Sequence, residues 1–141
     1  MTYLVDTNVW SELRNSSRAD HNVAAWAGAT SAAELYLSVV TVFELERGVR
    51  LIERRDGQQG ARLRRWLEEQ VLGPFERQIL PIDVAIARRS AALHVPDPRP
   101  ERDALIAATA LVHGLSVVTR NTADFEPTGV VLLNPWLGVE E

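Results

Sequence analysis

Short apolar runs alternate with helical patterns along the whole chain, and this alternation restricts the fold more than any other feature. The runs at residues 3–5 and 79–82 are three or four residues long, which suits buried strands. Between such runs, apolar residues recur every three or four positions, as in amphipathic helices. This pattern predicts an α/β fold, with a three-layer α/β/α sandwich around a mostly parallel five-stranded sheet. We expect one domain over residues 1–141.

The expected elements can be placed along the chain from these patterns and from capping residues. Residues 54–60 are expected to form a polar loop. Asp83 is expected to cap one helix, and His113 with Gly114 to end another. Asn22 is the expected cap of the second helix. The expected strands are 3–5, 37–40, 79–82, 116–119 and 130–133, and the expected helices are 8–14, 23–27, 42–52, 63–71, 84–94 and 102–113.

Composition excludes several classes of site. The chain has no cysteine, so disulfides and thiolate metal sites are absent, which fits a reducing cytoplasm. The amino-terminal residues lack the pattern of a signal peptide. No apolar run approaches the roughly 20 residues of a membrane-spanning helix. We therefore expect a cytoplasmic protein without a membrane segment.

The charged residues constrain the function further. The formal net charge is −4, which argues against a bulk electrostatic attraction to nucleic acid. All 15 basic residues are arginines. The absence of lysine excludes a P-loop lysine and a Schiff-base lysine, and it favours bidentate recognition wherever a basic side chain binds phosphate.

Four carboxylates lie at the end of an expected strand or at the beginning of an expected helix: Asp6, Glu44, Asp103 and Asp124. In a parallel sheet the carboxyl ends of the strands share one edge, where ligands bind. A cluster of carboxylates is costly unless a hard cation such as Mg²⁺ or Mn²⁺ neutralises it. Such a cation activates water and offsets negative charge in a phosphate-ester transition state. The pattern therefore favours a metal-dependent hydrolase, with either one or two metal ions.

Each acid also has a purely structural explanation. Glu44 and Thr41 match a capping box, and Asp103 suits the first turn of a helix. Asp6 suits a helix cap, and Asp124 suits an Asx turn. We favour the metal site because unrelated capping residues have no reason to gather at one edge of a sheet.

Two polar residues beside these acids are weaker candidates. Asn8 is placed to orient a carboxylate or a water, and Thr119 to donate to Asp6 or to a phosphate. A turn asparagine and a strand threonine are the simpler interpretations. A zinc site is not expected, because the three histidines are scattered without ligand spacing.

Four segments in order resemble the PIN domain. They are residues 4–8 (LVDTN), 41–45 (TVFEL), 103–110 (DALIAATA) and 118–125 (VTRNTADF). Within that family the chain is similar to the VapC-type toxin ribonucleases of bacterial toxin–antitoxin pairs. Residues 134–136 (NPW) are similar to those of a FitB-like subgroup. The resemblance covers essentially the whole chain.

The resemblance implies a five-stranded parallel α/β/α fold and cleavage of RNA that depends on Mg²⁺ or Mn²⁺. By motif match, Asp6, Glu44 and Asp103 are the implied metal ligands and activators of water. The chain departs from the family at the fourth acid, because many relatives have aspartate where Asn121 stands. Asp124 follows three residues later, so both Asn121 and Asp124 are catalytic candidates. The occupancy of a second metal site stays open.

The resemblance also implies partners. It implies a homodimer and a small VapB-like antitoxin whose C-terminal segment covers the acidic groove, often with an arginine among the acids. Trp26 and Leu51 are candidate contacts for that antitoxin, with core packing as the alternative interpretation. Arg47, Arg50 and Arg120 are candidates for contact with RNA, although each also suits an ordinary surface position. The expected substrate is a structured or unpaired RNA loop.

Three other functions remain possible at this level. The first is a nuclease of the same fold that acts on DNA or on flap structures, although the chain lacks large insertions. The second is a catalytically impaired PIN module that serves as a binding or autoregulatory scaffold with its antitoxin, which Asn121 favours. The third is a phosphatase or receiver-like switch phosphorylated on Asp6. The absence of lysine and of an aspartate at position 8 opposes this third function.

The crowding of acids leads to one expectation about stability. If like charges repel at the site, Asp6→Asn or Asp103→Asn should raise thermal stability in the absence of metal.

Overall fold

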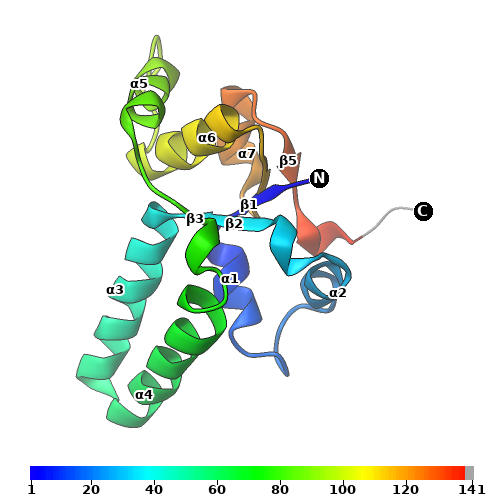
Figure 1. Cartoon of the computed structure of the whole chain (residues 1–141), viewed down its shortest axis with the longest axis vertical. Coiled ribbons are helices and arrows are strands. Elements are labelled where there is room, and N and C mark those ends of the chain that lie inside the picture. Colours follow the sequence, from blue (N-terminus) through cyan, green and yellow to red (C-terminus); the bar gives the residue numbers. More distant parts are fainter. Residues whose placement is uncertain (139–141) are drawn as a thin grey trace.

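The fold is built on one parallel sheet, and the computed structural model describes residues 1–138. The strand order is β3-β2-β1-β4-β5, so β1 is central (Figure 1). All four pairings are parallel, and Val5 lies opposite Val118. The α/β prediction is therefore confirmed. The strands are β1 (Tyr3–Val5), β2 (Leu35–Ser38), β3 (Ile79–Leu80), β4 (Ser116–Val118) and β5 (Leu132–Leu133).

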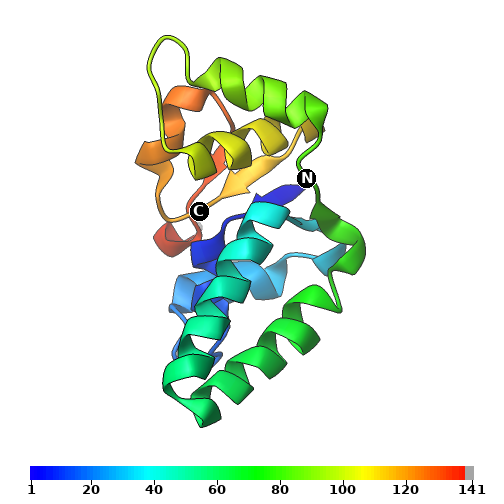
Figure 2. The ribbon, with the colours of Figure 1, turned by 90° about the vertical axis from the view of Figure 1, so that its left-hand side faces the viewer.

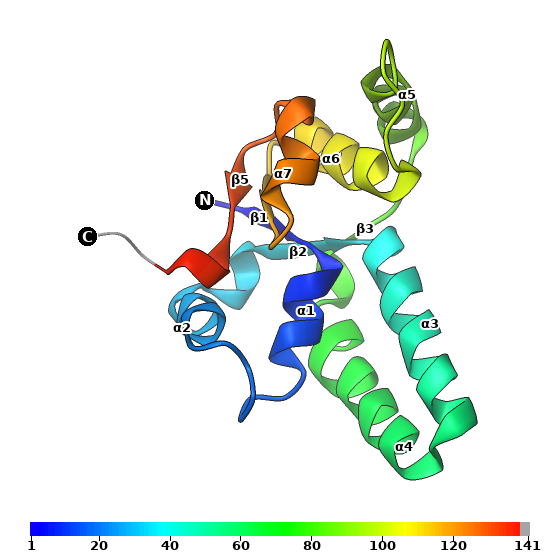
Figure 3. The same ribbon diagram turned by 180° about the vertical axis from the view of Figure 1, so that it is seen from behind.

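Helices cover both faces of this sheet. One group of helices packs on one face and a second group on the other, as the front and back views illustrate (Figures 1 and 3). The first group is α1 (Thr7–Leu13), α2 (His21–Ala29), α3 (Val39–Arg55) and α4 (Gly57–Trp66). The second group is α5 (Val84–Leu93), α6 (Glu101–His113) and α7 (Thr122–Phe125). A π-helical turn, η2 (Leu67–Leu72), continues α4.

The two faces of the sheet carry two separate hydrophobic cores. Because side chains alternate along a strand, Val5 packs in the core beneath α1–α4, whereas Leu4 packs beneath α6 and α7. On β4, Val118 packs in the same core as Val5, and Val117 packs in the same core as Leu4. Burial of each such side chain stabilises the fold by about 1.5–3 kcal/mol. Both cores therefore hold the carboxyl ends of β1 and β4 in fixed positions.

The boundary between β2 and α3 differs from the expected one. Val39 and Val40 were expected to end the strand, but they form the first turn of α3. Ser38 is the N-cap, and its hydroxyl accepts a hydrogen bond from the Val40 amide at 3.0 Å. The β-branched side chains of Val39 and Val40 favour a strand, but the N-cap at Ser38 outweighs this preference and starts the helix.

Two further expectations about α2 and α4 were wrong. Asp20, not Asn22, caps α2, because its carboxylate accepts from the amides of Asn22 and Val23. Residues 54–60 are not a loop. Asp56 is the single residue between α3 and α4. Its side chain caps α4 by accepting a hydrogen bond from the Gln59 backbone amide.

Other local predictions are confirmed. Asp83 caps α5, and its carboxylate accepts from the Ile86 amide at 2.9 Å. Gly114 ends α6 with φ 69°, in the left-handed region that favours glycine. None of the helices in residues 1–138 combines the length and apolarity that crossing a bilayer requires.

α3 and α4 form an antiparallel pair that extends away from the sheet (Figure 2). Arg64 on α4 binds Glu46 and Glu53 on α3, with shortest distances of 2.7 and 2.9 Å. The helices approach closely at Gly60, where an added Cβ would lie 2.5 Å from the Cα of Glu53. This pairing fixes the direction of α3, which carries Glu44.

Candidate active site

Asp6 lies at the carboxyl end of the central strand. It is fully buried, and it is also the N-cap of α1. Its Oδ1 accepts from the Thr7 amide at 2.8 Å, and its Oδ2 accepts from the Thr119 hydroxyl at 2.8 Å. Both the strand end and the following helix therefore orient this carboxylate.

Glu44 reaches the same place from the second turn of α3. Its Oε1 accepts from the Thr7 hydroxyl at 2.6 Å. The capping-box interpretation is wrong, because α3 begins at Val39 and Thr41 is inside the helix. The Thr41 and Thr7 hydroxyl oxygens lie 3.0 Å apart, so the buried Thr41 supports Thr7 instead.

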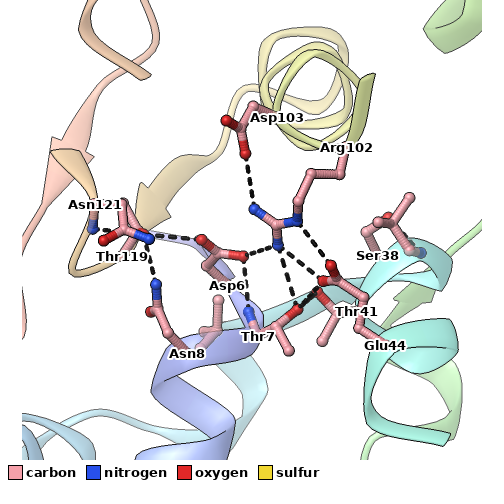
Figure 4. Close-up of polar contacts among 12 residues, drawn as sticks. Asp6, Thr7, Asn8, Ser38, Thr41, Glu44, Arg102, Asp103, Thr119 and Asn121 are labelled. Carbon is pink, nitrogen blue, oxygen red and sulfur yellow. Dashed lines mark hydrogen bonds and ion pairs between the residues drawn. The ribbon is translucent and has the colours of Figure 1, made fainter. Parts of the chain in front are cut away.

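Asp103 completes the set from the first turn of α6, where its carboxylate is 9% exposed. The structure therefore brings three of the four acids together from β1, α3 and α6, as Figure 4 shows. They are separated by up to 97 positions along the chain, from 6 to 103.

A residue that sequence reasoning missed lies between these acids. Arg102 donates from Nε and Nη2 to Glu44 at 2.8 and 2.9 Å. It also donates from Nη2 to Asp6 at 2.7 Å and from Nη1 to Asp103 at 2.8 Å (Figure 4). The only signal in the sequence was its position next to Asp103. The expectation of an arginine among the acids concerned the antitoxin, but the chain places one of its own there.

The pKa values of these groups follow from burial and from Arg102. Burial alone raises the pKa of Glu44, but hydrogen bonds from Arg102 and Thr7 outweigh it and lower that pKa below its ordinary value. Burial raises the pKa of Asp103, and repulsion from Asp124 and Asp6 adds to this despite Arg102. The carboxylates raise the pKa of Arg102 although burial opposes them, so the guanidinium stays charged.

Thr119 and Asn8 lie where the sequence placed them, beside Asp6. The Asn8 amide donates to the Thr119 hydroxyl oxygen at 3.2 Å, and this hydroxyl donates to Asp6. The Asn8 carbonyl oxygen accepts from the Arg120 amide at 3.3 Å. The two residues form a support behind the buried carboxylate.

The two candidates for the fourth site residue, Asn121 and Asp124, make fewer contacts with the three carboxylates. Asn121 precedes α7, and its backbone N–H donates to the Thr119 hydroxyl oxygen at 3.1 Å. Asp124 is exposed in the first turn of α7. Its charge nevertheless contributes to the raised pKa of Asp103. Both residues therefore border the acids, and neither contacts Arg102 within the described part of the chain.

The three arginines considered for RNA contact have different surroundings. Arg47 lies over the Phe43 ring at 5.1 Å, and its charge helps to lower the pKa of Glu44. Arg120 lies over the Trp136 ring at 5.2 Å. Arg50 is exposed and binds Glu46 on α3 at 2.7 Å. Arg47 is thus the one whose charge acts on the site.

Two hollows open beside Glu44. One of about 340 Å³ lies between α1, α3 and α4, and the other of about 560 Å³ lies between α3 and α6. Leu51 is 61% exposed and lines the first hollow. Trp26 is half-buried and packs edge-to-face on Tyr3 at 5.5 Å, so it belongs to the core instead. Phe43, Arg102 and Leu105 are among the residues that line the second hollow.

The donor set suits a hard cation, since carboxylate oxygens are the ligands that Mg²⁺ and Mn²⁺ prefer. Within residues 1–138, however, no three acidic or histidine side chains form a ready-made metal cage. In Figure 4 the guanidinium of Arg102 lies between the carboxylates. The residues fit the metal by chemistry, and in this structure the guanidinium of Arg102 bonds their carboxylate oxygens.

Comparison with known proteins agrees with this arrangement. The family model for the PIN domain matches residues 3–129, a range that contains Asp6, Glu44 and Asp103. A VapC ribonuclease of Sinorhizobium fredii is 36% identical over 138 residues, which are 94% of this chain and 96% of that protein. Toxin FitB of Neisseria gonorrhoeae is 38% identical over 139 residues, which are 94% of this chain and 97% of the toxin.

A solved structure shows the same likeness in three dimensions. The crystal structure of FitAcB from Neisseria gonorrhoeae aligns with a TM-score of 0.88 at 35% identity. The alignment covers 96% of this chain and 99% of that one. The likeness therefore extends over the sheet and over every element that carries a site residue.

Proposed function

Because the chain belongs to the PIN-domain family, we propose that it is the ribonuclease toxin of a toxin–antitoxin pair, and that it hydrolyses RNA with Mg²⁺ or Mn²⁺. The observation that carries the proposal is the convergence of Asp6, Glu44 and Asp103 at the carboxyl edge of the sheet. These side chains are the proposed metal ligands. A bound cation would supply an activated water and would neutralise charge on the phosphodiester as it is cleaved.

The chain's own residues would orient these ligands. Thr119 and the Thr7 amide fix the two oxygens of Asp6, and the Thr7 hydroxyl fixes Glu44. Such neighbouring hydrogen bonds orient metal ligands. Asn8 acts indirectly through Thr119. Asp124 and Asn121 border the acids, and we propose them as further catalytic residues.

The partners are part of the same proposal. Toxin FitB and the FitAcB structure of Neisseria gonorrhoeae are similar to this chain, and we propose a small VapB-like antitoxin as its partner. The hollow lined by Leu51 beside Glu44 offers an apolar surface for its C-terminal segment. A homodimer and a location in the cytoplasm remain predictions.

The test is cleavage of a total-RNA sample by the antitoxin-free protein with Mg²⁺, with Mn²⁺ and with EDTA. Glu44→Gln should lower the cleavage rate by about 100-fold or more, because an amide is a poor partner for a cation. Glu46→Gln is the matched control, since Glu46 is on the same helix but binds Arg64 and Arg50 instead. It should cleave at close to the wild-type rate.

The contrary results are also defined. Full activity of Glu44→Gln, with unchanged circular dichroism, would remove Glu44 from the chemistry. Absence of cleavage by folded wild-type protein with either metal would favour the scaffold function, and Asn121→Asp would then be the first variant to examine.

A further inference from the structure

The guanidinium of Arg102 uses its donors almost completely on the acidic site. It makes four hydrogen bonds of 2.7–2.9 Å to three carboxylates, two of them to Glu44. Bidentate, charge-assisted bonds of this length are the strong kind. Arg102 therefore holds Asp6, Glu44 and Asp103 around one point.

This arrangement leaves the charges only partly balanced. Three ionised carboxylates carry three negative charges, and one guanidinium offsets one of them. The remaining charge suits a divalent cation, which would need the same oxygens. Asp6 Oδ1, Asp103 Oδ1 and both oxygens of Glu44 are bonded to Arg102. Arg102 and a cation thus exclude one another at these atoms.

Two of the acids keep other supports if Arg102 leaves. Asp6 is still held by Thr119 and by the Thr7 amide, and Glu44 is still held by the Thr7 hydroxyl. Removal of the guanidinium would therefore leave these carboxylates aimed at the same point.

Arg102 also has a place to go. Its side chain is 32% exposed, in contrast to 1% for Asp6. It lines the hollow of about 560 Å³ between α3 and α6, together with Phe43 and Leu105. Long side chains occupy several staggered rotamers, so a swing of the guanidinium toward that hollow would not require a helix to move.

We propose that Arg102 is an internal counter-ion of the active site, and that a divalent cation binds only after the guanidinium has swung out toward the hollow between α3 and α6. This inference rests on the proposed metal-dependent function. Its consequence is that Arg102 weakens cation binding, since the competent state is only part of the population. In the absence of a cation, the same side chain stabilises the acids against one another.

The first test is calorimetric titration of metal-free protein with Mn²⁺. Arg102→Gln should bind Mn²⁺ about tenfold more tightly than wild type or better, because no guanidinium competes. Arg47→Gln is the matched control. It removes one positive charge near Glu44, but Arg47 lies over Phe43 and makes no hydrogen bond to the acids in residues 1–138. Its affinity should stay within about threefold of wild type. Equal or weaker binding by Arg102→Gln would overturn the proposal.

The second test uses the wild-type protein and does not depend on a variant that folds. The Nε–H signal of Arg102 can be assigned by nuclear magnetic resonance from its loss in Arg102→Lys. It should move toward the positions of exposed arginines as Mg²⁺ is added. A signal that stays in place up to millimolar Mg²⁺ would also overturn the proposal.

Failure of this inference can be told apart from failure of the proposed function. Metal-dependent RNA cleavage by wild type, with no gain in Mn²⁺ affinity in Arg102→Gln, would refute the counter-ion alone. Tighter Mn²⁺ binding by that variant, with no RNA cleavage by wild type, would refute the nuclease alone.

Discussion

Asp6 illustrates at the residue scale how a buried acid is tolerated. The carboxylate accepts from the Thr7 amide, the Thr119 hydroxyl and Arg102, so each of its oxygens has a partner. The expectation that Asp6→Asn raises stability assumed uncompensated repulsion among the acids. Arg102 supplies the compensation that the assumption lacked.

We therefore expect Asp6→Asn to lower the free energy of unfolding of the metal-free protein by about 1–3 kcal/mol, because removing one partner leaves buried polar groups unpaired. Chemical denaturation at pH 7 measures this change. Asp103→Asn is the comparison. Burial and neighbouring acids raise the pKa of Asp103, so replacement by a neutral side chain should cost less. A more stable Asp6→Asn variant would restore the repulsion model.

Arg102 shows at the same scale why part of the site was invisible in the sequence. Its partners Asp6 and Glu44 lie 96 and 58 positions away. Position 102 reads as the exposed start of a helix, and no local pattern distinguishes it from the other arginines. The acids could be identified because they follow strands or lie near the beginning of helices. Arg102 could not, because its role depends on the direction of its side chain in the folded structure.

At the scale of elements, α3 and α4 determine where Glu44 lies. The helices meet at Gly60, where a methyl group would lie 2.5 Å from the backbone of Glu53. Gly48, in the middle of α3, has no such neighbour within 4 Å. The same substitution should therefore have opposite effects at these two positions.

Gly60→Ala should lower the free energy of unfolding by about 1–3 kcal/mol. The added methyl group would clash with the backbone of Glu53, which cannot move aside as a flexible side chain can. Gly48→Ala should leave stability unchanged or raise it by up to about 1 kcal/mol, as alanine favours a helix. Thermal unfolding of the two variants measures the contrast. A stable Gly60→Ala variant would show that α4 can shift away from α3.

The boundary of β2 shows why some elements were misplaced. Residues 37–40 form a continuous apolar run with serine, which suits either a strand or a helix start. The position of Ser38 at the edge of the sheet, next to β1 and β3, makes it a cap. The same shift places Glu44 in the second turn, where it faces Thr7 rather than its own helix end.

At the scale of the whole molecule, low pH should destabilise the fold, because carboxylates that are paired in the folded state become protonated. The hydrogen bond from Arg64 lowers the pKa of Glu46 from an ordinary value of 4.5 to about 2. The pKa of Glu44 is also lowered. A carboxyl group whose pKa is lower in the folded state stabilises that state above pH 4.5, and this stabilisation is lost as the pH falls toward 2. Asp103 has a raised pKa and acts in the opposite sense.

The free energy of unfolding should therefore fall between pH 4.5 and pH 2. Glu46→Gln should flatten part of this decline, by about 1 kcal/mol or less, because Glu46 is partly exposed and its pairs are screened. Glu69→Gln is the control, since Glu69 is exposed and forms no ion pair within residues 1–138. Denaturation at several pH values measures the slopes. Identical slopes for wild type and Glu46→Gln would contradict the pairing with Arg64.

The sequence by itself determined the α/β class, the positions of β1 and β4, and Asp6 at the end of β1, because these depend on local periodicity and on the geometry of a parallel sheet. It also determined the caps at Asp83 and Gly114, where the partner lies within a few residues. Only the tertiary structure decided that Ser38 begins α3 and that α3 and α4 meet at Gly60. It alone placed Arg102 between the three carboxylates. These features depend on contacts between distant segments, whose energies no local pattern contains.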